Sequence, residues 1–277
     1  MVSPETDEGD EADRKQEDSM ETSDVSGRDQ RVLVLVPTYD EAENIRGAVR
    51  RVLAAVPQAD VLVLDDASPD GTGRIADDIA AADARVGVEH RRGKEGLGAA
   101  YVAGFRIGLE RGYDVMVEID ADGSHPAEVL PTMLAALASD PSVGLVVGSR
   151  WVPGGSVVNW PRRRELLSRG GNLYARTALR IPVKDATAGF RAYRSDVVRG
   201  MDLDSISSRG YFFQVDMTLR TLDAGHRVVE VPIEFREREA GESKMSGSIV
   251  REAMLKVTVW GAQRAWRRLR GLSPRRG

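Results

Sequence analysis

Two carboxylates one residue apart, Asp120 and Asp122, follow directly after the apolar run 115–119. Paired carboxylates at the carboxyl end of a strand can share a divalent cation, and Mg²⁺ completes its shell with water and phosphate oxygens. The spacing therefore favours a metal site that receives a diphosphate. The triplet alone is weak evidence, because most Asp-x-Asp triplets are two acids in a solvated turn.

Two further acidic segments occupy the same kind of position. Residues 37–45 follow the strand-like run 32–36, and residues 64–72 follow the start of the run 61–64. Ligands of open α/β sheets bind outside the carboxyl ends of the strands. Acidic loops placed at random would not be expected to fall at three strand ends, so the pattern favours one shared site.

These segments resemble the polyprenol (dolichol) phosphate mannose synthases, which are inverting family 2 glycosyltransferases. The resemblance runs from about Arg31 to Lys256 in the family's order. The further motifs are residues 96–101, 120–126, 148–150, 168–172, 187–191, 210–214 and 241–246. The first motifs are shared by many family 2 transferases, whereas the last two, 210–214 and 241–246, are more specific to the polyprenyl-phosphate branch.

The resemblance implies transfer of mannose from GDP-mannose to a polyprenyl phosphate, with inversion at C1, giving polyprenyl phosphate mannose and GDP. The product would be a lipid-linked mannose donor for protein or cell-envelope glycans. A divalent metal, Mg²⁺ or Mn²⁺, is implied as the cofactor. A phosphate monoester with a second pKa of about 6 arrives largely ionised and needs no general base. The reaction then needs in-line alignment and neutralisation of the departing GDP.

The resemblance also assigns roles to residues. It places the metal on Asp120 and Asp122, with Ala121 presenting its backbone to the nucleotide. Asp122 and Arg150 are the expected catalytic residues, since a guanidinium can hold a diphosphate with two parallel hydrogen bonds. The other residues expected to bind the nucleotide sugar are Pro37, Tyr39, Glu41, Leu64, Asp66, Arg238 and Lys244.

Several neighbouring residues are expected to have lesser roles. Asp65 is expected to be structural, Ser124 to act through water or not at all, and His125 to be a packed or solvent-facing side chain. Asp40 and Ala67 stand where the family often has Asn and Gly, which leaves the nucleotide and sugar preference open. Contact with the lipid phosphate and simple solvation both remain open for Arg162, Arg163 and Arg164, and Lys184, Arg191 and Arg194 are weaker candidates.

The hydrophobic periodicity predicts an α/β protein with strands and helices alternating up to Arg150. With the resemblance, this implies a Rossmann-like nucleotide-sugar-binding fold of the GT-A type, with a mostly parallel central sheet and a helical C-terminal extension. Strands are predicted at 31–36, 60–65, 85–89, 114–119, 143–148 and 227–233, and helices at 41–55, 72–82, 98–111, 126–138, 164–180, 211–224 and 247–270.

Charge and composition divide the chain into three parts. Residues 1–29 are expected to be a disordered acidic tail, because they hold many acids and almost no apolar residues. Residues 30–246 form the expected catalytic domain, and residues 247–277 a C-terminal amphipathic helix with a basic tail. The absence of cysteine excludes disulfides, thiolate metal sites and a cysteine nucleophile. The N-terminus lacks a signal pattern, and no apolar run approaches the ~20 residues of a membrane span.

An apolar stripe marks the last predicted helix. A basic amphipathic helix of this kind suits an anionic membrane surface, and the alternative is that the stripe packs on the protein's own core. The expected location is therefore cytoplasmic, peripherally on the cytoplasmic face of the membrane, with a membrane-embedded protein as a candidate partner and no nucleic acid. The stripe is Leu255, Val259, Ala262, Trp266 and Leu269; the flanking residues are Trp260, Arg264, Arg267, Arg268 and Arg270.

Three alternative functions differ in class or donor. The nearest is transfer of glucose or another sugar from a UDP-sugar to the same lipid phosphate. A non-catalytic nucleotide-sugar or lipid-phosphate binding module is disfavoured by the intact Asp120 and Asp122. A dinucleotide-binding oxidoreductase is disfavoured because no Gly-x-Gly-x-x-Gly turn follows the first strand.

Overall fold

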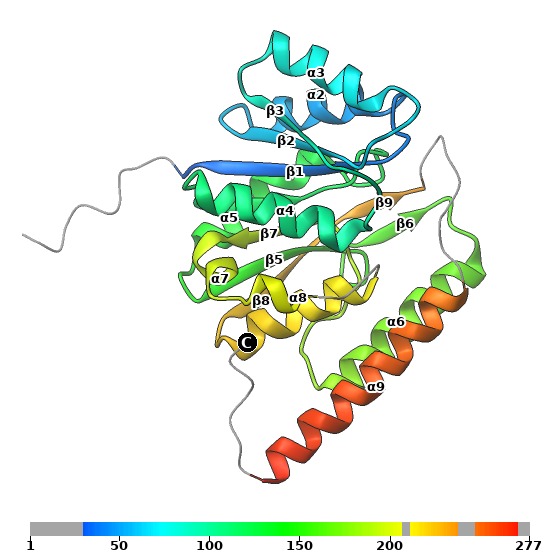
Figure 1. Ribbon diagram of the computed structural model, residues 1–277. Coiled ribbons are helices and arrows are strands. Elements are labelled where there is room, and N and C mark those ends of the chain that lie inside the picture. Colours follow the sequence, from blue (N-terminus) through cyan, green and yellow to red (C-terminus); the bar gives the residue numbers. More distant parts are fainter. Residues whose placement is uncertain (1–29, 207–210, 238–246, 271–277) are drawn as a thin grey trace, which may run out of the picture. The chain divides into compact units, whose positions relative to one another are not determined.

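A seven-stranded sheet with the order β3-β2-β1-β4-β7-β5-β8 lies at the centre of the computed structural model (Figure 1). The structure describes residues 30–206, 211–237 and 247–270. Only β7 runs antiparallel to its neighbours in this sheet, and the other pairs are parallel. The strands are β1 (Val32–Thr38), β2 (Asp60–Asp65), β3 (Val86–His90), β4 (Val115–Glu118), β5 (Val143–Ser149), β7 (Arg191–Arg194) and β8 (Arg227–Pro232).

Helices cover both faces of the sheet, and strands such as β1 are apolar on both sides. In β1, Val32, Val34 and Val36 belong to one buried cluster, and Leu33 and Leu35 to another. The first cluster packs under helices α2 (Ile45–Ala55), α3 (Thr72–Ala82) and α5 (Leu130–Ala138); the second packs under α4 (Leu97–Glu110), α7 (Ser195–Arg199) and α8 (Tyr211–Asp223).

A third buried cluster joins α8 to the two remaining long helices, α6 (Arg162–Leu179) and α9 (Gly247–Leu269). α6 and α9 lie side by side, and the Tyr174 and Thr258 hydroxyls are 2.6 Å apart between them (Figure 1). A Cβ at Gly261 would come within 2.8 Å of the Ala178 carbonyl oxygen. The close approach of the two helices therefore depends on glycine at this position.

The predicted alternation is confirmed in the described residues up to Ser149, with two differences in detail. Helix α2 begins at Ile45 rather than 41, since residues 42–44 form a turn. The predicted helix 126–138 begins with the short 3-10 turn η1 (Ala127–Val129) before α5. The remaining predicted elements, 164–180, 211–224, 227–233 and 247–270, match α6, α8, β8 and α9 closely.

The sequence did not predict several short elements. β7 was missed because it begins and ends with an arginine, and a search for apolar runs rejects such a segment. The others are η2 (Leu203–Ser205), α7, and the strands β6 (Ser156–Val158) and β9 (Glu234–Arg236), which pair in a separate two-stranded sheet.

Some expectations concern residues that the structure does not describe. These are the acidic tail 1–29, the segment that contains Arg238 and Lys244, the side chains of Arg267 and Arg268, and residues 271–277 of the basic tail. The described residues from Arg31 onward belong to one compact unit, in which α9 packs against α6 and α8. Among the described helices, none is long and apolar enough to cross a membrane.

Candidate active site

The carboxyl ends of β1, β2 and β4 meet at one edge of the sheet. β1 pairs in parallel with both other strands, with Thr38 opposite Asp65 and Leu35 opposite Glu118. Asp120 lies two residues beyond Glu118. The three acidic segments singled out in the sequence are therefore brought to the same edge, as the strand pattern predicted.

The loop after β1 is tied to the loop after β2 by hydrogen bonds. The backbone N–H of Asp40 donates to the Ser68 hydroxyl at 3.2 Å, and that of Glu41 donates to the Thr72 hydroxyl at 2.9 Å. The Glu41 carboxylate accepts from the Asn44 side-chain amide at 2.7 Å. Glu41 thus helps to shape the turn before α2, in addition to the nucleotide contact expected of it.

Adjacent aspartates at the end of β2 have different surroundings. Asp65 accepts from the Thr38 hydroxyl at 3.2 Å and the Ser68 hydroxyl at 2.5 Å, which agrees with its expected structural role. Asp66 forms an ion pair with Arg91. Burial raises the pKa of Asp66, and the nearby Arg91 guanidinium opposes that shift.

Two of the expected nucleotide contacts look different in the structure. The Leu64 side chain is fully buried in the cluster under α4, so only its backbone could face a ligand. The leucine was included because its motif matched, and the motif does not show which way the side chain points. The Lys94 ammonium lies 3.7 Å from the centre of the Tyr39 ring, on a surface where a base could stack.

Asp40 and Ala67, the two departures from the family pattern, both adopt left-handed backbone conformations, with φ of 59° and 55°. A left-handed conformation costs an ordinary residue about 1–2 kcal/mol, and less for Asp or Asn. The family's usual Gly at the second position would avoid this cost. Ala67 is therefore held in place at some expense of stability.

The carboxylates of Asp120 and Asp122 are both partly exposed at this edge. The Asp122 carboxylate accepts from the Ser124 backbone N–H at 3.0 Å and from its hydroxyl at 2.6 Å. The Asp120 backbone N–H donates to Nδ1 of the buried His125 at 3.1 Å. Ser124 and His125 thus orient the turn that presents the carboxylates, a role that the sequence reasoning did not assign to them.

The donor set fits a divalent cation that also binds a ligand. Within the described part of the chain, no group of three or more acidic or histidine side chains could hold a metal ion. Asp120 and Asp122 offer two hard oxygen ligands with solvent beside them. Mg²⁺ and Mn²⁺ sites of this kind are completed by water and phosphate oxygens.

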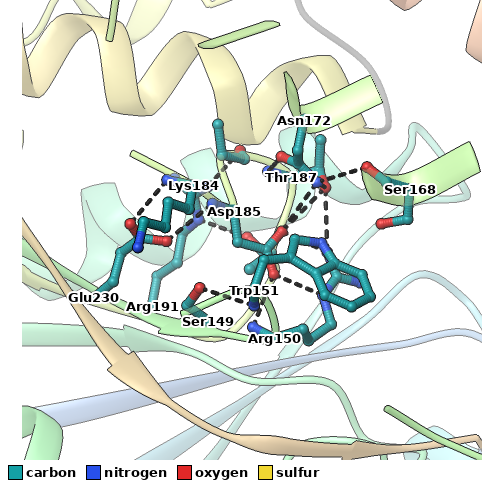
Figure 2. Close-up of polar contacts among 12 residues, drawn as sticks. Ser149, Arg150, Trp151, Ser168, Asn172, Lys184, Asp185, Thr187, Arg191 and Glu230 are labelled. Atoms are coloured by element: carbon teal, nitrogen blue, oxygen red, sulfur yellow. Dashed lines mark hydrogen bonds and ion pairs between the residues drawn. The ribbon is translucent and has the colours of Figure 1, made fainter. Parts of the chain in front are cut away.

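Arg150 follows β5 and is held by a carboxylate that the sequence reasoning missed (Figure 2). Its Nε and one terminal nitrogen each donate to the Asp185 carboxylate at 2.7 Å. Asp185 is fully buried, and the Thr187 hydroxyl accepts a further bond from Arg150 at 3.2 Å. The Asn172 side-chain amide of α6 donates to the same Asp185 and Thr187 oxygens.

The pairing changes the expected role of Arg150. Its charge is matched by Asp185, so it adds less net attraction for a diphosphate than an arginine without an acidic partner. A rigid, correctly aimed guanidinium is what the pair provides. The only signal in the sequence was an acid two residues before the 187–191 motif, and the pairing across 35 residues appears only in the fold.

A buried polar network begins two residues before Asp120, at Glu118. Glu118, in β4, accepts from the Gln214 side-chain amide of α8 at 2.8 Å. Burial raises the pKa of Glu118 to about 8, although Arg191 and Gln214 favour the charged form. Among the described residues, the Tyr101 hydroxyl and one oxygen each of Glu118 and Gln214 have no hydrogen-bond partner. The sequence reasoning had treated Glu118 as part of an apolar strand.

The remaining cationic candidates differ in their surroundings. Fully buried Arg191 donates to the carbonyls of residues 186, 188 and 214, and Arg194 donates to those of residues 137 and 143. Arg164 pairs with Glu237, whereas Arg162 and Arg163 are exposed. The Lys184 backbone N–H donates to Glu230.

The family model of glycosyl transferase family 2 matches residues 33–201. The protein belongs to this family and is a glycosyltransferase.

Curated relatives narrow the comparison. The chain is 58% identical over 240 residues to an undecaprenyl-phosphate mannosyltransferase of Micrococcus luteus, covering 87% of this chain and 98% of the relative. It is 54% identical over 244 residues to a polyprenol monophosphomannose synthase of Mycolicibacterium smegmatis, covering 88% and 91%. These relatives confirm the resemblance found in the motifs.

Solved structures support the fold. A glucosyl-3-phosphoglycerate synthase from Mycobacterium tuberculosis superposes with a TM-score of 0.64 at 18% identity, covering 84% of this chain and 80% of that one. A mannosyltransferase from Pyrobaculum calidifontis, in complex with GDP-Man and Mn²⁺, gives a TM-score of 0.56 at 20% identity, covering 87% and 65%.

Proposed function

We propose that the protein transfers mannose from GDP-mannose to a polyprenyl phosphate, with inversion at C1, giving polyprenyl phosphate mannose and GDP. The observation that carries this proposal is the Asp120–Asp122 pair at the carboxyl edge of the sheet, in a chain 58% and 54% identical to two polyprenyl-phosphate mannosyltransferases. The Mn²⁺ in a mannosyltransferase of similar fold supports a divalent cofactor.

The residues of the edge would divide the work. Asp120 and Asp122 would hold the metal, which when bound neutralises charge on the leaving diphosphate. Tyr39 and Asp66 would receive the base, with Glu41 near the ribose. Arg150 is aimed by Asp185 and would align the diphosphate, and Arg238 and Lys244 remain candidates in a segment outside the described residues.

No side chain is needed to activate the acceptor. A polyprenyl phosphate is largely ionised near neutral pH, since its second pKa is about 6. The protein must instead bring the phosphate in line with the sugar's C1 and the departing oxygen. Because the acceptor stays in a bilayer, we place the protein on the cytoplasmic face of a membrane, where nucleotide sugars are available.

The test uses three labelled donors with one acceptor. The purified protein is incubated with labelled GDP-mannose, UDP-glucose or UDP-GlcNAc, a polyprenyl phosphate and Mn²⁺ or Mg²⁺, and the lipid is then extracted. We expect label in the lipid from GDP-mannose only, no transfer with EDTA, and a β-linked product by NMR. Labelling chiefly from a UDP-sugar would show that GDP-mannose is not the donor, and an α-linked product would exclude inversion.

A further inference from the structure

A row of aromatic rings links the turn after β4 to the residues after β5. The His125 ring meets the Phe235 ring edge-on at 5.4 Å between centres, and Phe235 meets Trp160 in the same way at 5.4 Å. Trp160 in turn meets Trp151 at 6.4 Å. Each ring comes from a different segment, namely the turn after β4, β9, the residues before α6 and the residues after β5. This aromatic row (His125, Phe235, Trp160 and Trp151) therefore connects the turn that carries the two metal-binding candidates to Arg150.

Backbone hydrogen bonds hold the aromatic row at both ends. The Arg236 backbone N–H, in the strand that carries Phe235, donates to the Ser124 carbonyl at 3.2 Å. At the other end, the Trp151 backbone N–H donates to the Ser149 hydroxyl at 3.3 Å. The positions of the end rings are thus fixed by the main chain as well as by packing.

Trp160 contacts two arginine side chains. The guanidinium carbon of Arg164 lies over its ring at 4.1 Å from the centre, and that of Arg150 lies over it at 5.4 Å. A cation within about 6 Å of a tryptophan ring centre is attracted by the electrons of the ring face. Trp151 contacts Arg150 as well, at 5.4 Å (Figure 2). Trp160 is therefore a ring that Arg150 and Arg164 share.

Each of these two arginines also pairs with a carboxylate. Arg150 pairs with Asp185, and Arg164 pairs with Glu237. A guanidinium bonds a carboxylate through its edge and an aromatic ring through its face, so both contacts can be made at once. The carboxylate fixes the edge of the guanidinium, and the ring fixes its plane.

The indole groups of the row are kept at a cost. Among the described side chains, the indole N–H groups of Trp151 and Trp160 are buried and have no hydrogen-bond partner. A buried donor without a partner costs free energy, and phenylalanine or leucine would avoid that cost. Packing alone therefore does not explain tryptophan at position 160. Tryptophan is also the side chain that attracts a cation most strongly, which fits a ring that holds guanidinium groups.

We propose that Trp160 is a positioning residue, whose ring holds the Arg150 and Arg164 guanidiniums so that they can receive a substrate phosphate. The proposal rests on the proposed function, because the phosphate belongs to a substrate of that reaction. It is either the diphosphate of the donor or the phosphate of the acceptor, and the experiment separates the two. The sequence left phosphate contact and solvation open for Arg164 and did not single out Trp160.

Two substitutions at Trp160 separate the ring face from the bulk of the side chain. Trp160→Phe keeps an aromatic face, Trp160→Leu does not, and both lose the indole N–H. We expect Trp160→Leu to lower kcat/KM for mannose transfer at least about tenfold, and Trp160→Phe to stay within about threefold of the wild type. Equal losses for the two variants would overturn the proposal. If circular dichroism shows that Trp160→Leu does not fold, Trp160→Met takes its place.

Trp260→Leu is the matched control. Trp260 is partly buried like Trp160 and packs edge-on against Phe212, with ring centres 4.6 Å apart. It faces α8, so the sequence expectation that it lies at a membrane surface was wrong. The control loses the same ring from a different cluster, and its kcat/KM should stay within about twofold of the wild type. A tenfold loss in the control would show that any lost indole disturbs transfer, which would overturn the proposal.

A double-mutant cycle shows whether Trp160 acts through an arginine. Arg164→Gln removes the guanidinium that lies closest to the Trp160 ring centre. Residues that act through each other have non-additive effects, so Trp160→Leu should cost less in this background than in the wild type. The same fold loss in both backgrounds would contradict the proposal.

Calorimetry with two ligands identifies the phosphate. GDP with Mn²⁺ probes the diphosphate of the donor, and a short-chain polyprenyl phosphate in detergent probes the phosphate of the acceptor. Binding of either ligand to Trp160→Leu that is at least about fivefold weaker supports the proposal and names the phosphate. Unchanged binding of both, with unchanged kcat/KM, overturns it. If the wild type transfers no mannose, the proposed function fails, and the two binding measurements still decide the role of Trp160.

Discussion

Two aspartates near the site, Asp122 and Asp185, have different surroundings, and we expect them to have different roles. Asp122 is partly exposed and held by Ser124, which leaves it able to meet a hydrated cation. Asp185 is fully buried and bonded in a fork to Arg150. We therefore expect substitution of Asp122 to affect turnover with the fold retained, and substitution of Asp185 to lower stability in addition to disturbing the position of Arg150.

Asp122→Ala should lower turnover at least about a hundredfold while the fold is retained. The substitution would remove a proposed ligand of the cation, which when bound would stabilise developing charge on the leaving diphosphate, a transition-state effect. The measurement is steady-state transfer from GDP-mannose, with circular dichroism as the check on folding. Ser124→Ala is the control and should cost far less, since it removes only a bond to the carboxylate. A near-normal rate for Asp122→Ala, with metal still required, would place the ion elsewhere.

Asp185→Asn should lower the free energy of unfolding by about 3–5 kcal/mol, because it leaves the buried guanidinium of Arg150 without a countercharge. Asp78→Asn is the matched control. Asp78 pairs with Arg46 at 3.4 Å, and both side chains are more than half exposed. An exposed pair contributes below about 1 kcal/mol. Equal urea midpoints for the two variants would show that the Arg150–Asp185 pair carries no special cost.

At the scale of single residues, the sequence identified which residues lie at the ends of strands better than it identified which side chains pair with each other. Asp120 and Asp122 were found because they follow an apolar run, which is a local feature. Asp185 was missed because its partner Arg150 is 35 residues away and only the fold brings them together. Leu64 was assigned to the ligand because its motif matched, although strand alternation turns its side chain into the core.

At the scale of elements, the regular part of the fold was predictable because both faces of the central strands are buried. Such strands read as continuous apolar runs, and the helices between them read as amphipathic. β7 escaped prediction because its fully buried Arg191 is stabilised by carbonyl oxygens of residues 186, 188 and 214. The carbonyl of residue 214 is 23 residues away, and the sequence gives no sign that an arginine here is buried rather than part of a polar loop.

Helix α9 provides a matched pair of substitutions at this scale. Trp260→Ala should lower the free energy of unfolding by about 2 kcal/mol, since it removes a partly buried ring packed on Phe212. Trp266→Ala should change it by less than about 0.5 kcal/mol, because that ring is 51% exposed. Chemical denaturation of both variants in the absence of lipid makes the comparison. A larger effect for Trp266 would contradict the orientation of the helix.

At the scale of the whole molecule, the candidate active site and the cluster of long helices occupy different regions. The acidic edge is built on β1, β2 and β4, whereas α6, α8 and α9 form a separate buried cluster. Charge and composition in the sequence had instead divided the chain into an acidic N-terminal tail, a catalytic domain and a C-terminal helix with a basic tail. The sequence did not show that α6 packs against α9, because a contact between residues 84 positions apart, such as Tyr174 and Thr258, has no local signature.

Metal and nucleotide should stabilise the whole molecule jointly. GDP with Mn²⁺, at about 100 times the dissociation constant, should add about 2.7 kcal/mol to stability. For a domain of this size that raises the unfolding temperature by about 5–10 °C. Thermal unfolding with GDP, with Mn²⁺ and with both checks the joint effect, and UDP in place of GDP gives the comparison. The same shift in Asp122→Ala would show that the nucleotide binds without this metal pair.

Two of the residues proposed to bind the base already contact cations of the protein: Tyr39 contacts Lys94, and Asp66 contacts Arg91. These cations would compete with the nucleotide for the same two side chains. If the base stacks on Tyr39 as proposed, it must first displace an ammonium group from the ring face and a guanidinium from the carboxylate. Part of the binding free energy then offsets the loss of these two contacts, so the observed affinity is lower than the nucleotide's own contacts would give. Because the displaced groups are cations, they become available to the incoming phosphates. Donor binding would thus be an exchange of partners, in which Lys94 and Arg91 leave Tyr39 and Asp66 and can contact the phosphates.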